Sequence, residues 1–131
     1  MELVRRANVV SLSNSGVTSE QLLSPENSRS ERVTVTRVTV APRAKNPRHA
    51  HANSEQVWVA LRGNAHLLLD GTTTAPFGEG DVVRFIEGDV HGLENLGPEE
   101  FVYLSVTSPP VNFRAAYSRD WRESEGGGAA S

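Results

Sequence analysis

The sequence predicts an all-β protein, a sandwich or a barrel of about seven or eight short strands. Runs of β-branched and aromatic residues recur along the chain, and Gly, Pro, Asn or Asp separates each run from the next. No stretch between residues 30 and 108 keeps the 3.6-residue apolar period of a helix. With 131 residues, the chain has the length expected of one domain.

The first 30 residues are expected to form an N-terminal arm. Residues 13–30 are rich in Ser, Asn and Thr, which predicts irregular structure with one turn of helix near residues 19–23. Residues 1–12 contain the apolar run VVSL. This run is a candidate strand for pairing with a second copy of the chain.

Residues 31–112 are expected to form the barrel. The strongest strand signal is ERVTVTRVTV at 31–40, although its apolar phase shifts around Arg37, which predicts a bulge or a strand buried on both faces. QVWVALRG and AHLLLDG follow, and the Asp-Gly pair at 70–71 is typical of a hairpin turn. The segments GDVVRFI, VHGLEN and EFVYLSVTS predict three further strands.

Residues 113–131 are expected to form a C-terminal arm and tail. The segment FRAAYSRDWRES at 113–124 is compatible with a short helix and with an extended arm, and the sequence leaves both open. The final GGGAAS is expected to be flexible.

Composition excludes several classes of function. There is no cysteine, so disulfides and thiolate metal sites are excluded. The formal net charge of −3 gives no basic field for a nucleic-acid partner. No run of apolar residues is long enough to span a membrane, and no apolar segment typical of a signal peptide follows the first arginines. We therefore expect a cytoplasmic protein without nucleic-acid or membrane partners.

Two histidines in PRHAHANSEQVWVALRG suggest a metal site. His49 and His51 are two residues apart, so on an extended chain they project to the same face, where one ion can reach both imidazoles. The pair alone is a weak signal, because exposed polar residues produce it as well. A third histidine, His91, follows in GDVVRFIEGDVHGLEN.

These segments resemble the two motifs of the cupin superfamily. The first motif, G-x5-H-x-H-x3,4-E-x6-G, is matched by the histidine pair and by its closing Gly63. The second motif, G-x5-P-x-G-x2-H-x3-N, is matched by four residues, Gly80, Gly88, His91 and Asn95. The chain departs from the pattern at the opening glycine of the first motif, near which Arg43 or Ala44 stands, and at the proline, which is Ile86. The resemblance implies a single-domain double-stranded β-helix, or jelly-roll barrel.

The resemblance also implies one divalent transition metal ion bound by three histidines, His49, His51 and His91. Fe, Mn, Ni, Co, Cu and Zn all suit such a site, and the sequence does not rank them. Cupins usually add a carboxylate after three or four intervening residues, which here offers Glu55 or Gln56. Adjacent strand residues face opposite sides, so only one of the two can point at the ion. The motif places six residues between this ligand and its closing glycine, and residues 57–62 are the six that separate Gln56 from Gly63, which favours Gln56.

Other residues are candidates for the substrate pocket or for catalysis. If Gln56 points inward, strand alternation also turns Trp58, Ala60 and Arg62 inward, so Trp58 and Arg62 are pocket candidates. Trp58 is equally compatible with a core residue unrelated to substrate.

Glu55 and Tyr103 are catalytic candidates by location alone. Tyr103 shares one strand face with Phe101 and Ser105, and which face this is stays open. His66 matches no ligand position and is expected to be structural.

The cupin resemblance implies an enzyme that acts on a small oxygen-chelating substrate. No spare His or Asp stands near the motifs to act as a general base, which favours metal-centred, dioxygenase-like chemistry. A non-oxidative isomerase, lyase or cyclase acting on a keto or sugar acid is the first alternative. A non-catalytic module that binds a metal or a small ligand is the second. Cupins of this size resemble one another in forming homodimers, so a homodimer is expected.

Overall fold

The computed structural model describes residues 1–122, and its elements confirm the all-β class. The larger sheet contains, in spatial order, β1 (Val10–Asn14), β2 (Val17–Leu23), β3 (Thr34–Val40), β10 (Phe101–Ser108), β5 (Glu55–Arg62) and β8 (Val82–Phe85). The smaller sheet contains β4 (Lys45–His49), β9 (His91–Glu94), β6 (Asn64–Leu68) and β7 (Thr74–Gly78). All of these strand pairs are antiparallel. A 3-10 turn η1 (Arg6–Asn8) and a short helix α1 (Arg114–Tyr117) complete the described elements.

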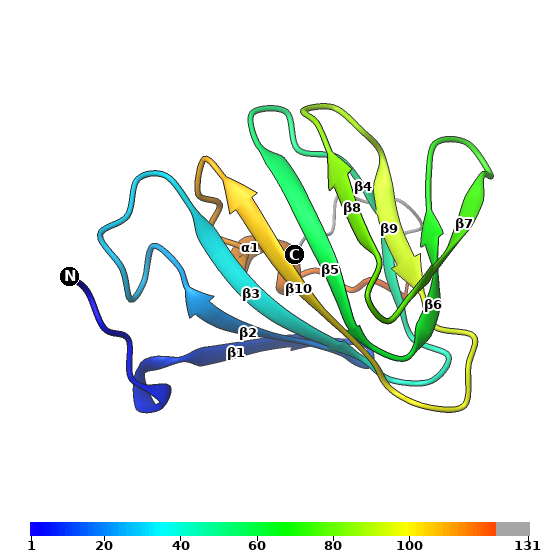
Figure 1. Ribbon diagram of the computed structural model, residues 1–131, viewed down its shortest axis with the longest axis horizontal. Helices are drawn as coiled ribbons and strands as arrows, with labels where there is room; N and C mark the ends of the chain where they lie inside the picture. The colour runs from blue at the N-terminus through cyan, green and yellow to red at the C-terminus, as the bar shows by residue number, and fades with distance from the viewer. Residues whose placement is uncertain (123–131) are drawn as a thin grey trace.

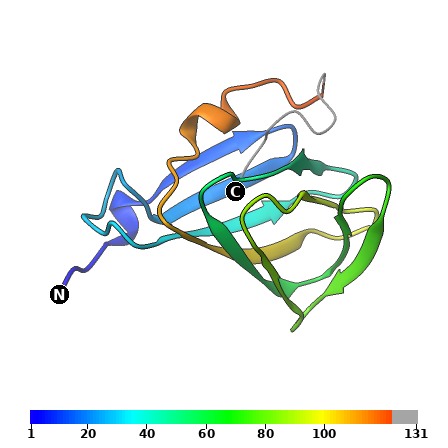
Figure 2. The same ribbon diagram turned by 90° about the horizontal axis from the view of Figure 1, so that it is seen from above.

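The two sheets curve around a shared interior, as the view from above shows (Figure 2). The connections β4–β5, β6–β7 and β8–β9 lie together at the top of Figure 1, and we call this the upper end of the barrel. No helix in residues 1–122 is long and apolar enough to cross a membrane. The cytoplasmic location stays a prediction.

The irregular structure predicted for residues 13–30 is wrong over its first half. Residues 10–14 and 17–23 form the β1–β2 hairpin, and β2 pairs with β3 in the larger sheet. The helical turn predicted at 19–23 is part of β2. Composition concealed this strand because two of its interior positions carry polar side chains, the buried Ser19 and Gln21, where an apolar alternation would have been expected.

The phase shift in β3 has a similar origin. The strand pairs with β10 without interruption from Thr34 to Val40, so no bulge lies at Arg37 in this pairing. Its interior residues are two threonines followed by two valines, Thr34, Thr36, Val38 and Val40. Arg37 faces outward and forms an exposed ion pair with Glu20 of β2 at 2.9 Å. The apolar pattern shifts because threonine occupies half of the interior positions.

The barrel interior is therefore apolar toward one end of its axis and polar toward the other. Apolar side chains fill the lower end, where Val17 and Val40 face one another across β2 and β3 and Phe101 begins β10. Buried polar side chains gather toward the upper end, on the upper halves of β2, β3, β5 and β10: Gln21, Thr34, Thr36, Gln56, Ser105 and Thr107. The histidines of the predicted metal site lie at this polar end.

The C-terminal arm combines the two conformations left open by its sequence. Its helix spans only the four residues of α1, and the flanking residues are not helical. The arm lies beside β1 (Figure 2), where Asn14 Nδ2 donates a hydrogen bond of 2.9 Å to the Tyr117 carbonyl oxygen. Phe113, Tyr117 and Trp121 are buried and anchor it. The GGGAAS tail lies outside the described residues.

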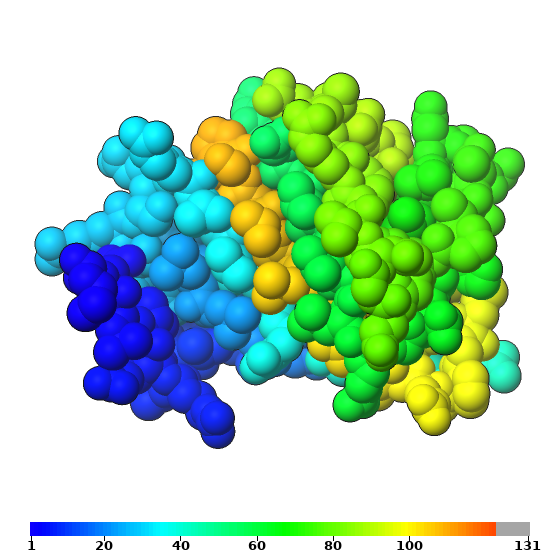
Figure 3. Space-filling view, viewed as in Figure 1, coloured from blue at the N-terminus to red at the C-terminus, as the bar shows by residue number. Residues whose placement is uncertain are grey.

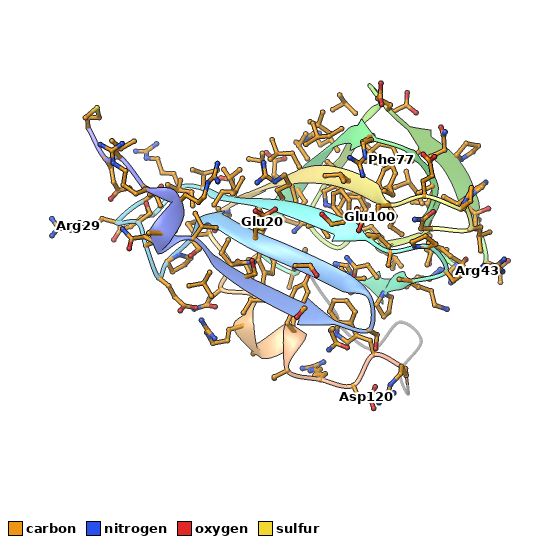
Figure 4. All side chains as sticks on the ribbon, turned by 90° about the horizontal axis from the view of Figure 1, so that it is seen from below. Glu20, Arg29, Arg43, Phe77, Glu100 and Asp120 are labelled. Atoms are coloured by element: carbon orange, nitrogen blue, oxygen red, sulfur yellow. The ribbon has the colours of Figure 1, made fainter. Side chains whose placement is uncertain are left out.

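Arg43 occupies the position of the missing motif glycine. It lies six residues before His49 and has φ +71°, the left-handed region that glycine adopts without strain. The backbone conformation of the motif is thus kept, with an arginine whose exposed side chain extends from the rim of the molecule (Figure 4).

Replacing Arg43 by glycine is expected to stabilise the protein. Relief of the left-handed strain outweighs the added chain entropy of glycine, so Arg43→Gly should raise the free energy of unfolding by about 0.5–1 kcal/mol. Arg43→Ala removes the same exposed side chain but keeps the strain, and serves as the matched control. Urea denaturation measures both variants. Equal stability of the two would show that the backbone at residue 43 is not strained.

Candidate metal centre

Three histidine side chains meet at the upper end of the barrel. His49 ends β4 and His91 begins β9, and the two residues are paired across the strands. His51 lies two residues beyond the end of β4. One ring nitrogen from each histidine lies within 4.8 Å of the other two, a spacing compatible with a single metal ion. The pattern of H-x-H with a distant His91 therefore does produce a cluster.

An irregular pairing between β4 and β9 brings the histidines together. Asn46 pairs with Leu93 and His49 pairs with His91, so two residues of β4 lie opposite the single Gly92 of β9. A Cβ at Gly92 would lie 2.7 Å from the Asn46 carbonyl oxygen, which is closer than real Cβ atoms approach. Glycine at this position permits the close contact that sets the direction of His49.

Backbone carbonyl groups fix which nitrogen of two rings faces the cluster. His49 Nδ1 lies 2.7 Å from the Pro47 carbonyl oxygen, and His91 Nδ1 lies 2.8 Å from that of Asp89. A carbonyl oxygen only accepts, so each Nδ1 carries the hydrogen and each Nε2 carries a lone pair. Nε2 of His49 and of His51 is buried without a hydrogen-bond partner. Such orphaned nitrogens are the atoms that a metal ion would satisfy.

Burial keeps the three imidazoles neutral. Loss of solvation lowers the pKa of His49 well below its usual value, and the nearby His91 lowers it further. Burial also lowers the pKa of His51. It lowers the pKa of His91 to about 4, although the hydrogen bond to the Asp89 carbonyl acts in the opposite direction. At neutral pH these lone pairs are therefore available to a metal.

The same pKa shifts predict an acid-sensitive apoprotein. Between the unfolded pKa of 6.5 and the folded pKa of about 4, the unfolded chain binds more protons at His91 than the folded chain does, so stability falls as the pH falls. His91 alone should remove about 1–2 kcal/mol of unfolding free energy between pH 6.5 and 5. Urea denaturation in the presence of a chelator measures this loss. The loss should shrink in His91→Gln, and an equal loss in that variant would contradict the assignment.

The structure places Gln56 inside the barrel and Glu55 outside. Gln56 is 1% exposed, and its Oε1 lies 3.1 Å from Nε2 of His91. Glu55 forms an exposed ion pair with Arg84 at 2.7 Å. Glu55 as a catalytic group at the centre is therefore wrong, because strand alternation turns it to the outer surface once Gln56 faces inward.

Trp58 lies inside the barrel beside the histidines. Its side chain is fully buried, and its ring centroid is 5.5 Å from that of His91. The indole N–H donates a hydrogen bond of 3.0 Å to Gln56 Oε1. Phe85 stacks on the His91 ring at 4.4 Å with a tilt of only 12°, and it also contacts Trp58 at 5.0 Å. These two aromatic rings fix the orientation of the His91 imidazole.

The inward orientation predicted for Arg62 is wrong. Ala60 faces the interior as expected, but the pairing of β5 with β10 shifts by one residue between Ala60 and Arg62. Arg62 is exposed, contacts Glu100 at 3.4 Å and lies at the lower end of the barrel, opposite the histidines. Arg62 therefore does not line a pocket at the metal centre.

Tyr103 lies on the interior face of β10, in line with Phe101 and Ser105. Its hydroxyl accepts a hydrogen bond of 3.2 Å from Asn46 Nδ2. Its ring contacts Trp58 at 4.6 Å, and Trp58 in turn contacts His91. Tyr103 is thus connected to the centre through one intervening side chain.

His66 is not part of the cluster. It lies in β6, opposite Pro76 of β7 and Glu94 of β9. The structural role predicted for it stays a prediction.

Two contacts of the centre were missed by reasoning from the sequence. Thr107 Oγ1 accepts a hydrogen bond of 2.9 Å from Gln56 Nε2. Phe113 of the C-terminal arm is buried, and its ring lies 6.1 Å from that of His51. Strand alternation in β10 could have indicated Thr107, because it lies on the same face as Tyr103 and Ser105. No feature of the sequence indicated that Phe113 lies near His51.

Comparison with known proteins agrees with this geometry. A family model described as a cupin domain matches residues 36–107, more than half of the chain. The chain belongs to the cupin family. Among curated proteins none matches it.

Solved structures resemble this cupin over most of its length. The polyketide cyclase RemF from Streptomyces resistomycificus is 24% identical, with a TM-score of 0.69, covering 82% of this chain and 79% of that one. A cupin 2 conserved barrel domain protein from Salinispora arenicola is 28% identical, with a TM-score of 0.63 and coverage of 82% and 86%. A predicted oxalate decarboxylase from Thermotoga maritima is 24% identical, with a TM-score of 0.68 and coverage of 82% and 98%. These likenesses confirm the predicted cupin barrel.

Proposed function

We propose that this cupin binds one divalent transition metal ion through the Nε2 atoms of His49, His51 and His91 and through Oε1 of Gln56. The support comes from the contact between His91 and Gln56. Nε2 of His91 carries a lone pair, and Gln56 Oε1 already accepts the Trp58 N–H, so no hydrogen lies between these two atoms although they are 3.1 Å apart. Two buried lone pairs facing one another at this distance repel unless a cation joins them.

The proposed ligands are all uncharged. Three imidazoles and one amide leave the double charge of the ion uncompensated, which favours binding of an anionic substrate with two oxygen donors. The ion would supply Lewis acidity toward such a substrate. Fe, Mn, Ni, Co, Cu and Zn remain the candidates, since nitrogen and oxygen donors accept all of them.

We further propose an enzyme that acts on a small oxygen-chelating substrate by metal-centred, dioxygenase-like chemistry. Among the described residues, no Asp, Glu, Lys or Arg side chain is buried in the interior. The barrel therefore offers no carboxylate as a general base beside the histidines, which favours chemistry centred on the ion. The buried hydroxyl and amide groups of the upper end suit an oxygen-rich ligand.

A non-oxidative isomerase, lyase or cyclase of a keto or sugar acid is the second candidate. Tyr103 favours it, because this interior hydroxyl is hydrogen-bonded to Asn46 and is one of the few interior groups able to transfer a proton. Similar structures include a polyketide cyclase, a sugar phosphate isomerase and a predicted oxalate decarboxylase, whose activities differ and do not choose one for this chain.

Oxygen uptake distinguishes these functions. The metal-loaded protein is mixed with catechol-type diols, β-dicarbonyls and keto acids, with and without oxygen, and substrate loss is followed by NMR. The proposal expects substrate loss that stops without oxygen and consumes it in proportion. Equal loss without oxygen would replace it with the non-oxidative candidate. Saturable binding of these compounds without any turnover would instead support a non-catalytic module that binds a small ligand.

We also propose that the chain forms a homodimer. β1 is an edge strand of the larger sheet, and the N-terminal residues project from one corner of the molecule (Figure 3). A groove between the N-terminal residues and strands β2 and β3 is lined by Val4, Arg6, Val9, Glu20, Leu22 and Arg37. Exposed Leu3 and Val10 add apolar surface there. Light scattering at micromolar concentration tests the proposal, and a monomeric mass would contradict it.

A further inference from the structure

We propose that Trp58 and Thr107 are positioning residues of the metal centre: together they hold the Gln56 amide with its oxygen toward the three histidines. The proposal rests on the metal site proposed above and adds residues that do not themselves contact the ion.

The orientation of the Gln56 amide follows from its two partners. An indole N–H only donates, so the Gln56 atom that lies 3.0 Å from Trp58 Nε1 must be the oxygen. The amide nitrogen then lies 2.9 Å from Thr107 Oγ1, which accepts its hydrogen. Were the amide turned over, two N–H groups would face one another at Trp58. Trp58 therefore decides the orientation, and Thr107 holds the other end.

The positions of these partners follow from the sheet. Gln56 and Trp58 are two residues apart on β5, so both side chains point into the barrel. Thr107 of β10 is the direct cross-strand partner of Gln56. All three side chains are at most 1% exposed, so water does not compete for these hydrogen bonds.

The network holds the oxygen in place before an ion arrives. An amide that is already oriented loses little rotational freedom when its oxygen binds the ion, so both hydrogen bonds favour metal binding. A buried indole N–H needs an acceptor in any protein, so Gln56 satisfying Trp58 without influence on a metal is the competing explanation. The two explanations differ in whether Trp58 changes the metal affinity through Gln56.

The first experiment observes the indole directly. The chain has two tryptophans, so a ¹⁵N-labelled sample gives two indole N–H signals, and Trp121→Phe assigns them. Trp121 donates to the Ala116 carbonyl oxygen in the C-terminal arm and serves as the internal control. Titration of Zn²⁺ into the apoprotein should shift the Trp58 signal and leave the Trp121 signal unchanged. A Trp58 signal that does not move at saturation would overturn the proposal.

The second experiment tests whether Trp58 acts through Gln56. Trp58→Phe keeps an aromatic side chain, although a smaller one, and removes the N–H, and Thr107→Val replaces the hydroxyl with a methyl group of similar size. Each should weaken Co²⁺ binding about tenfold, as changes to partners of metal ligands commonly do, and shift the visible absorption bands of bound Co²⁺. Thr107→Ser should restore the parent behaviour, and Trp121→Phe should leave binding unchanged.

A double variant provides the decisive comparison. If Trp58 acts through Gln56, Trp58→Phe should have no further effect on Co²⁺ affinity in a Gln56→Ala background. A full tenfold effect in that background would overturn the proposal and assign Trp58 to packing against His91. Failure of the parent protein to bind Co²⁺ at all would instead contradict the proposed metal site, so the two failures are distinguishable.

Discussion

His91→Ala is expected to abolish stoichiometric metal binding. The variant removes one of three converging Nε2 atoms, and the loss of affinity should exceed the roughly 10- to 100-fold that follows changes outside the ligand set. Metal content after reconstitution and gel filtration should fall from one ion per chain to a small fraction. His66→Ala removes a histidine from β6 outside the cluster and should keep the parent stoichiometry.

Truncation of His91 also removes a buried ring that stacks on Phe85, so folding must be checked separately. His91→Gln keeps more of the buried volume, and circular dichroism of both variants shows whether the sheets form. Folded His91 variants that retain one tightly bound ion per chain would show that the metal binds elsewhere.

Gln56→Ala and Glu55→Ala are expected to differ sharply, although the two residues are neighbours. Loss of the buried Gln56 should weaken metal binding about 10-fold or more, because the fourth donor atom disappears. It also leaves the Trp58 N–H without its acceptor, which should cost about 1–3 kcal/mol of stability.

Loss of Glu55 breaks only an exposed ion pair with Arg84, which contributes at most about 1 kcal/mol, and should leave metal affinity unchanged. Isothermal titration of both variants with Co²⁺ measures the difference. Weak binding in Glu55→Ala together with parent affinity in Gln56→Ala would reverse the choice of fourth ligand. Gln56→Glu adds a test of charge, since both of its oxygens would find donors in Trp58 and Thr107.

Motif spacing predicted the histidine cluster, because strand geometry converts spacing into direction. His49 and His51 converge, and the count back from Gly63 selected the residue that faces inward. The structure also explains the asparagine of the second motif: the Asn95 amide donates hydrogen bonds to the carbonyl oxygens of Val40 and Glu99.

The errors came where local alternation is interrupted or hidden. Arg62 was expected inside because period two was extended across a register shift that the sequence does not mark. β2 was missed because a strand that faces a polar interior lacks the apolar alternation by which strands are recognised. Phe113 reaches His51 from a segment about sixty residues away in sequence, a contact that only the three-dimensional arrangement provides.

Anomalous diffraction from crystals of the Co²⁺-loaded protein tests the central claim most directly. One anomalous peak is expected per chain, bonded to Nε2 of His49, His51 and His91 and to Oε1 of Gln56. The absence of a peak at the three histidines, or a peak bonded to them while the Gln56 oxygen points away from the ion, would contradict the account.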